Sequence, residues 1–273
     1  MRAPRRPASR RPATRPSTAR RTRAQAAVAA VAAAVLVAPL TLAAGSAAAD
    51  DAADDAALPV TTTSEVVGTS VRGLPMTVVH RTTEGATRRV LVIGSIHGDE
   101  RAGMRVVRAL RDRVDLPDQL DLWLARTVNP DGTAADRRTN DHGVDLNRNF
   151  PYNWHTSSRD ETWSGPRPLS EPESVALRDL VRRLDPWLVI TFHQPLFGVG
   201  VNDKGYRTVK ALAAGMRLPL EDFVCTGICY GTFTQWVNNR TDGLAVTVEF
   251  GHRVRDWRIR AAARTVVDVG AGG

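Results

Sequence analysis

Six short segments of this chain are rich in apolar, often β-branched residues and are bounded by polar or turn-forming positions. Runs of this length and composition are typical of buried β-strands. The clearest of them begin at Val90, Leu188 and Leu244, where apolar residues follow one another with hardly a polar interruption. The pattern predicts strands at residues 66–71, 76–80, 90–96, 120–126, 187–192 and 244–250.

Longer segments between the later strands predict helices at residues 101–114, 170–184, 208–216 and 255–269. In segment 170–184, Ser170 and Glu173 match a capping box. In this motif, the side chain of each residue accepts a hydrogen bond from the backbone amide of the other. The early strands could pair as a hairpin, and strands and helices alternate after them. This order favours an α/β fold with a mixed parallel and antiparallel central sheet and helices on both faces.

The first 49 residues have the layout of a secretory signal peptide. Residues 1–23 hold nine arginines and no acid, residues 24–44 are almost wholly apolar, and Ala47, Ala48 and Ala49 offer small residues at a cleavage site. A twin-arginine export signal at Arg20-Arg21 is one alternative, and an uncleaved membrane anchor is another. Because the apolar stretch is mostly alanine and contains Pro39, we expect cleavage, export to the cell-wall exterior and no stable membrane insertion.

The leader also explains the strongly basic composition. The full chain has 37 basic and 29 acidic residues, and removal of the nine leader arginines leaves 28 against 29, a formal charge of −1. Nucleic acid is therefore not an expected partner. We expect a disordered acidic lead-in at residues 50–63, one catalytic domain at 64–269, a flexible tail at 270–273, and a monomer.

Polar residues follow three of the predicted strands. His97 and Glu100 come after the first, His193 after the second and Glu249 after the third. In open α/β sheets, ligands bind at the edge formed by the carboxyl ends of the strands. Catalytic zinc takes three protein ligands from imidazole nitrogen and carboxylate oxygen and keeps a position for water. We predict that His97, Glu100 and His193 bind one Zn²⁺ and that Glu249 acts as a base.

The order of these residues resembles the zinc carboxypeptidase family, and within it the bacterial murein peptide amidases. Those enzymes hydrolyse the bond between γ-D-glutamate and diaminopimelate in peptidoglycan peptides. The likeness covers roughly residues 64–254 and implies a zinc carboxypeptidase-like fold and hydrolysis of an amide bond next to a free carboxylate. Its matching pieces are His97-x-x-Glu100, Asn129-Pro130-Asp131-Gly132, Asn147-Arg148, the segment from Ser164 to Glu173, His193, Gly231 to Trp236, and Glu249.

The resemblance assigns roles to residues around the metal. Asp145 matches the carboxylate that hydrogen-bonds the first histidine ligand, although a turn residue after Gly143 is the alternative. Glu249 matches the base that takes a proton from the attacking water and returns it to the leaving amine. Arg137 matches the residue that stabilises the oxyanion, with Arg138 one position away as the alternative.

Three further residues are implied in substrate binding. Asn147 and Arg148 match the pair that binds the terminal carboxylate, for which the planar fork of arginine is suited. Counting back from Glu249 without gaps places Thr234 at the base of the specificity pocket. A hydroxyl there suggests a polar leaving residue, and diaminopimelate, with its amine and carboxylate, is of this kind.

Other functions share parts of this pattern. A general metallocarboxypeptidase would act on ordinary peptides, and a small-molecule deacylase would use the same zinc chemistry. Such deacylases are usually cytoplasmic, so the export leader is evidence against one. A non-catalytic wall-binding module would show aromatic clusters, repeats and a broken metal set, whereas aromatic residues make up only 5% of this chain and every catalytic position is filled.

Both cysteines, Cys225 and Cys229, lie in the part of the chain that we expect to be exported. Disulfides form and persist outside the cytoplasm, so the sequence favours a local disulfide that braces one wall of the cleft. A zinc knuckle is the other interpretation, but two thiols without nearby partners make a poor structural site.

Overall fold

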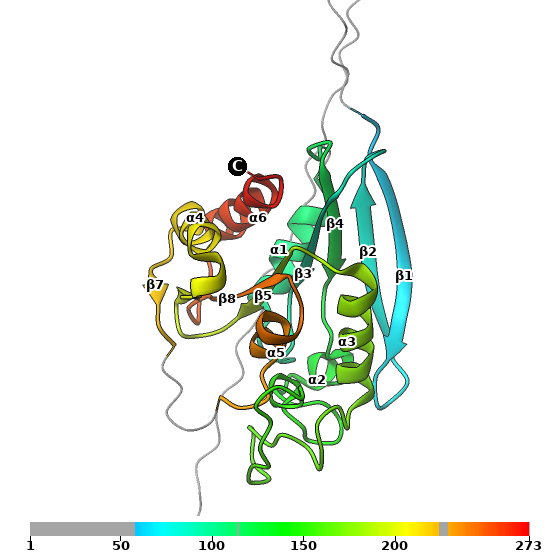
Figure 1. Cartoon of the computed structure of the whole chain (residues 1–273). Coiled ribbons are helices and arrows are strands. Elements are labelled where there is room, and N and C mark those ends of the chain that lie inside the picture. The colour runs from blue at the N-terminus through cyan, green and yellow to red at the C-terminus, as the bar shows by residue number, and fades with distance from the viewer. Residues whose placement is uncertain (1–57, 114, 224–228, 273) are drawn as a thin grey trace, which may run out of the picture. The chain divides into compact units, whose positions relative to one another are not determined.

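A mixed β-sheet forms the centre of the protein (Figure 1). The computed structural model describes residues 58–113, 115–223 and 229–272. The strands in these residues follow the spatial order β1-β2-β4-β3-β5-β8-β6-β7. Their bounds are β1 Thr61–Thr69, β2 Pro75–Thr82, β3 Arg88–Ile93, β4 Leu120–Ala125, β5 Leu188–His193, β6 Gly198–Gly200, β7 Leu220–Glu221 and β8 Leu244–Glu249.

Helices connect the strands and cover both faces of the sheet. Helices α4 and α6 lie side by side (Figure 1), and α6 also packs against α1. The bounds are α1 Ala102–Arg111, α2 Pro130–Ala135, α3 Pro172–Leu184, α4 Tyr206–Met216, α5 Phe233–Arg240 and α6 Asp256–Gly270, with single 3₁₀ turns η1 Leu146–Arg148 and η2 Asp203–Gly205.

The alternation of side chains along β3 creates two hydrophobic cores. Val90 and Val92 are fully buried in a core that α1, α4 and α6 complete. Leu91 and Ile93 point to the opposite face and are buried in a second core with residues of α3 and α5. Because successive strand residues face opposite sides, the apolar run from Val90 to Ile93 needs helices on both sides of the sheet. The predicted fold class is therefore confirmed.

Three parallel neighbours, β3, β5 and β8, carry the predicted site to one edge of the sheet. The register pairs Ile93 with Thr191, and it pairs His193 with Glu249. Because parallel strands end on the same side, the residues that follow β3 meet the last residues of β5 and β8. The antiparallel pairs are β1–β2, β2–β4 and β6–β8.

The termini of the described fold differ from the prediction. Strand β1 begins at Thr61, so residues 61–63 of the expected disordered lead-in pair with β2. Helix α6 includes Gly270, and the amide of Ala271 donates to the carbonyl of Val267. The first part of the expected flexible tail is therefore a helix end.

The capping box predicted at Ser170 is wrong. Helix α3 begins at Pro172 with Glu171 at the N-cap, and no side chain caps it. Glu173 instead accepts hydrogen bonds from the amide of Val71 and from the side chain of Asn140, at 3.1 Å each. Contacts between distant segments thus replace the local pairing.

Several elements were not expected from the sequence. Helix α2 contains Pro130 and Gly132 and has no apolar periodicity. It forms because the side chain of Asn129 accepts a hydrogen bond from the amide of Gly132 at 2.9 Å. Helix α5 and the short strands β6 and β7 were also missed.

Two predictions concern residues that the structure does not describe. The predicted signal peptide, residues 1–49, falls within the undescribed residues 1–57, and Cys225 of the predicted disulfide falls within residues 224–228. Among the described helices, none combines the length and the apolar character needed to cross a bilayer.

Candidate active site

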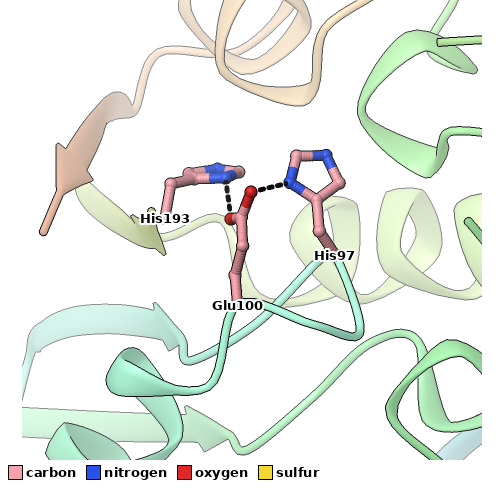
Figure 2. A group of neighbouring side chains, drawn as sticks. All are labelled: His97, Glu100 and His193. Carbon is pink, nitrogen blue, oxygen red and sulfur yellow. Dashed lines mark hydrogen bonds and ion pairs between the residues drawn. The ribbon is translucent and has the colours of Figure 1, made fainter. Parts of the chain in front are cut away.

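His97, Glu100 and His193 point toward one another from three positions at the sheet edge (Figure 2). His97 lies in the loop after β3, Glu100 lies just before α1, and His193 is the last residue of β5. The two carboxylate oxygens of Glu100 lie 2.7 Å from Nδ1 of His97 and 2.9 Å from Nδ1 of His193. The structure therefore brings together all three predicted zinc ligands, and all are buried.

Close backbone packing fixes the loop that carries His97. The hydroxyl of Ser95 donates to the carbonyl of His97 at 2.5 Å. A Cβ atom on Gly98 would lie 2.0 Å from the backbone of Gly132 in α2. Since no side chain fits in that space, only glycine allows the metal loop and α2 to approach so closely.

The charges around His97 favour a cation. Burial alone would lower the pKa of His97, but the carboxylates of Glu100 and Asp145 outweigh it and raise that pKa. Burial would likewise raise the pKa of Glu100, yet the two histidines hold it well below its usual range.

This donor set fits zinc. The three donor atoms, two imidazole nitrogens and one carboxylate oxygen, lie within 4.8 Å of one another. They match the nitrogen and oxygen ligands of catalytic zinc sites, which use three protein ligands.

Asp145 lies behind the first ligand, as the sequence predicted. Its Oδ1 is 3.1 Å from Nε2 of His97 and also accepts from the amide of Asn147 at 2.8 Å. Its Oδ2 accepts from Arg138 at 2.8 Å. Burial would raise the pKa of Asp145, but His97 and Arg138 keep it far below its usual range. Asp145 is thus a fixed anion that directs Nδ1 of His97 toward Glu100.

Glu249 closes β8 beside His193. Its Oε2 accepts a hydrogen bond from the amide of Leu196 at 3.2 Å. Its other oxygen has no hydrogen bond to a described residue, and the side chain lines the same cleft as the three ligands. Burial raises the pKa of Glu249, although His193 opposes the shift. A desolvated carboxylate of this kind is a stronger base than an exposed one.

Arg138, and not Arg137, lies at the metal site. Arg137 donates to Asp141 at 2.7 Å and is not among the residues that line the cleft. Arg138 donates to Asp145 and, at 3.4 Å, to Glu100. The two arginines follow the C-cap of α2 at Asp136, which lies in the left-handed region with φ of 52°, and their side chains take different partners.

Asn147 and Arg148 present hydrogen-bond donors to the cleft. The side-chain oxygen of Asn147 accepts from the amide of Phe233 at 3.0 Å, which leaves its NH₂ group for a ligand. Arg148 donates through Nη1 to the carbonyl of Asn147 at 2.8 Å. Its Nε is buried without a described partner, and the residue lines the cleft, where its guanidinium is placed to meet a carboxylate.

Thr234 lies in the cleft, as predicted, next to a second hydroxyl. Its Oγ1 is 2.9 Å from Oγ1 of Thr247 in β8. Both threonines line the cleft, whose volume is about 670 Å³. The two hydroxyls give this part of the cleft, which we call the floor, a polar surface.

Comparison with known proteins agrees with this geometry. A family profile described as zinc carboxypeptidase matches residues 53–195. Murein peptide amidase A of Vibrio campbellii is 34% identical over 201 residues, which cover 68% of this chain and 77% of that protein. The chain belongs to the zinc carboxypeptidase family. It is similar to murein peptide amidases.

Two further relatives of this zinc carboxypeptidase come from Escherichia coli. Murein peptide amidase A of strain K12 is 32% identical over 163 residues, and the match spans 54% of this chain and 64% of the relative's length. The crystal structure of murein-tripeptide amidase from strain O157 superposes with a TM-score of 0.64 at 28% identity, covering 80% of this chain and 94% of that one.

Some residues of the cleft were not found from the sequence. Thr247 lies within an apolar strand pattern, which gives no sign of a functional role. Gln235 lies in helix α5, which was not predicted. Asp222 follows β7, a strand of two residues. For Arg138, the adjacent Arg137 was a signal, and the choice between them required the structure.

Proposed function

We propose that this protein is an exported, zinc-dependent peptidase that hydrolyses the bond between γ-D-glutamate and diaminopimelate in peptidoglycan peptides. The observation that carries the proposal is the position of Arg148 in the same cleft as His97, Glu100, His193 and Glu249. A site built in this way favours an amide bond whose leaving residue has a free carboxylate. The named activity of the similar proteins supports the choice of bond.

Three residues would bind the metal, and a fourth would orient one of these ligands. His97, Glu100 and His193 would bind Zn²⁺, with Asp145 fixing the ring of His97. When bound, zinc polarises a carbonyl and lowers the pKa of water. The fixed orientation of the ligands means that the cleft need not reorganise when a substrate enters.

Glu249 and Arg138 act on the reacting groups. Glu249 takes the proton of the attacking water through its free oxygen and passes it to the nitrogen of the leaving amine. Arg138 faces the developing negative charge on the carbonyl oxygen, where a fixed donor stabilises the transition state more than the substrate. Its hydrogen bonds to Asp145 hold the guanidinium beside the metal ligands.

The leaving residue lies between Arg148 and the polar floor. Arg148 and Asn147 bind its carboxylate next to the scissile bond, and its side chain extends toward Thr234 and Thr247. This half-buried hydroxyl pair disfavours an apolar side chain, because polar groups left without partners in a complex cost free energy.

The test is hydrolysis by the purified, zinc-loaded protein. L-Ala-γ-D-Glu-meso-diaminopimelate is compared by mass spectrometry with ordinary α-linked tripeptides that have the same leaving residue. We expect release of diaminopimelate from the γ-linked peptide at a higher kcat/KM. Faster cleavage of the α-linked peptides would replace this proposal with a general carboxypeptidase.

Export is tested separately. The full chain is produced in a bacterium, and the N-terminus of the protein outside the cytoplasmic membrane is sequenced. The leader predicts a mature chain that starts at Asp50. A protein that stays membrane-bound with its leader intact would instead support the anchor, and the same sample gives the oligomeric state, for which we expect a monomer.

A further inference from the structure

We propose that Asp222, together with the side-chain amide of Gln235, binds the distal ammonium group of the leaving diaminopimelate. This inference rests on the proposed function and adds a residue that selects the substrate. The proposal follows from the position of Asp222, the charges around the cleft, and the unpartnered oxygen of Gln235.

Asp222 lies on the outer wall of the cleft. It follows β7, which pairs in parallel with β6, and the amide of Val201 donates to the carbonyl of Glu221 at 2.9 Å. Because Gly200 pairs with Glu221, the next residues, Val201 and Asp222, lie opposite each other, and both line the cleft. Asp222 is exposed, so it can meet a substrate without a change in the fold.

Asp222 is the one carboxylate of the cleft, among the described residues, that has no role in the proposed catalytic mechanism. Of the three described carboxylates that line the cleft, Glu100 binds the metal and Glu249 is the base. Within the described part of the chain, the Asp222 carboxylate makes no hydrogen bond or ion pair. An amino group of the substrate is a natural partner for such a carboxylate, since charge-assisted hydrogen bonds are among the strong ones in proteins.

Gln235 supplies a second acceptor. Its Oε1 is buried and has no hydrogen-bond partner among the described residues, although the residue lines the cleft. The helix start holds it in place, because its amide donates to Oγ1 of Thr232 at 3.2 Å. Buried polar atoms without a partner are rare. An ammonium group has three N–H donors, so after pairing with Asp222 it still has donors for this oxygen once the Gln235 side chain turns into the cleft.

The distal end of diaminopimelate carries a carboxylate as well, and the floor can bind it. One hydroxyl of the Thr234–Thr247 pair donates to the other, which leaves one hydroxyl hydrogen for the substrate. Lysine has the distal ammonium but lacks the carboxylate, whereas 2-aminopimelate has the carboxylate but lacks the ammonium. The two analogues therefore separate the contribution of Asp222 from that of the floor.

The experiment compares γ-linked tripeptides that end in meso-diaminopimelate or in 2-aminopimelate. For Asp222→Asn, we expect kcat/KM on the diaminopimelate peptide to fall roughly tenfold to hundredfold, mainly through KM, because a charged hydrogen bond is lost. The 2-aminopimelate peptide should change by less than about twofold. Gln235→Met should show a smaller loss that is also confined to the diaminopimelate peptide.

Glu221→Gln is the matched control. It removes the same charge from the neighbouring residue, which does not line the cleft, and we expect both peptides to be cleaved as by the wild type. The proposal is overturned if Asp222→Asn slows the two peptides equally or leaves both unchanged.

The substrates that the wild-type protein cleaves show whether the proposed function itself fails. If the wild type cleaves only α-linked peptides, the same variants are tested on α-peptides that end in lysine or norleucine. Asp222→Asn should then lower the preference for lysine, and an unchanged preference would overturn the role of Asp222 by itself.

Discussion

Oδ1 of Asp145 lies 3.1 Å from Nε2 of His97, while Nδ1 of the same ring faces Glu100. A ring that donates through Nε2 to a carboxylate has its Nδ1 lone pair directed at the metal position. Asp145 is fully buried and is also held by Arg138. One carboxylate therefore links the orientation of a metal ligand to that of the cationic side chain beside it.

Asp145→Asn should weaken zinc binding. The amide is neutral and cannot accept from His97, Asn147 and Arg138 at the same time, so the His97 ring loses part of its support. Loss of such a partner typically lowers metal affinity 10- to 100-fold, which is measured by competition with a chelator. Asp141→Asn is the control, because that residue pairs with Arg137 away from the cleft. Equal zinc affinity in the two variants would contradict the role of Asp145.

Glu249→Gln should keep zinc and lose turnover. The amide preserves the shape of the side chain but cannot take a proton, and a general base contributes roughly 10²- to 10⁴-fold to the rate. Metal content and kcat are measured on the same preparation. A zinc-loaded variant that turns over at the normal rate would remove Glu249 as the base.

Arg138→Gln and Arg137→Gln form a matched pair. Both remove one positive charge, but only Arg138 lines the cleft. We expect kcat to fall roughly 10²- to 10³-fold for Arg138→Gln, as for the loss of one oxyanion donor, and to stay near the wild-type value for Arg137→Gln. Zinc content is checked in both variants. The opposite order would restore the assignment made from the sequence.

The contribution of Glu173 to the free energy of unfolding should depend on pH. Burial, with the nearby Glu171 adding to it, raises the pKa of Glu173 above its ordinary value. The folded state then binds a proton that the unfolded state has already released. Stability is therefore lost as pH rises from the ordinary glutamate pKa, about 4.3, through the raised folded pKa.

Glu173→Gln lacks this titration, although it also loses one hydrogen bond to Asn140 or Val71. The free energy of unfolding is measured with urea for both proteins, with a chelator present, from about pH 4 to about pH 7. We expect the wild type to lose stability relative to the variant as pH rises. A difference that stays constant with pH would show that Glu173 titrates alike in both states.

The metal site could be predicted because its determinants are local. His193 and Glu249 end apolar strands, and His97 and Glu100 lie in the short loop after another. Parallel neighbours in a sheet bring such ends together. The predicted strands β3, β5 and β8 agree with the structure to within a few residues at each end. Their apolar pattern is strong because two cores bury both faces.

The remaining parts of the site depend on contacts that the sequence does not express. Helix α2 is capped by the side chain of Asn129, and of the two arginines after it, only Arg138 reaches Asp145. Glu173 binds Val71 and Asn140 and not the helix end that its spacing suggested. Asp222 and Gln235 share a cleft only through the pairing of β6 with β7 and the packing of α5.

The approach of Gly98 to Gly132 has a consequence for how this enzyme can vary. Arg138 also binds the loop at Gly98 through its carbonyl, which accepts from the amide of Gly98 at 3.3 Å. The parts that perform the chemistry are thus locked together by main chain and have little freedom to shift independently. The wall at Asp222 is made of side chains at a sheet margin, so substrate preference can drift there while the reaction itself is conserved.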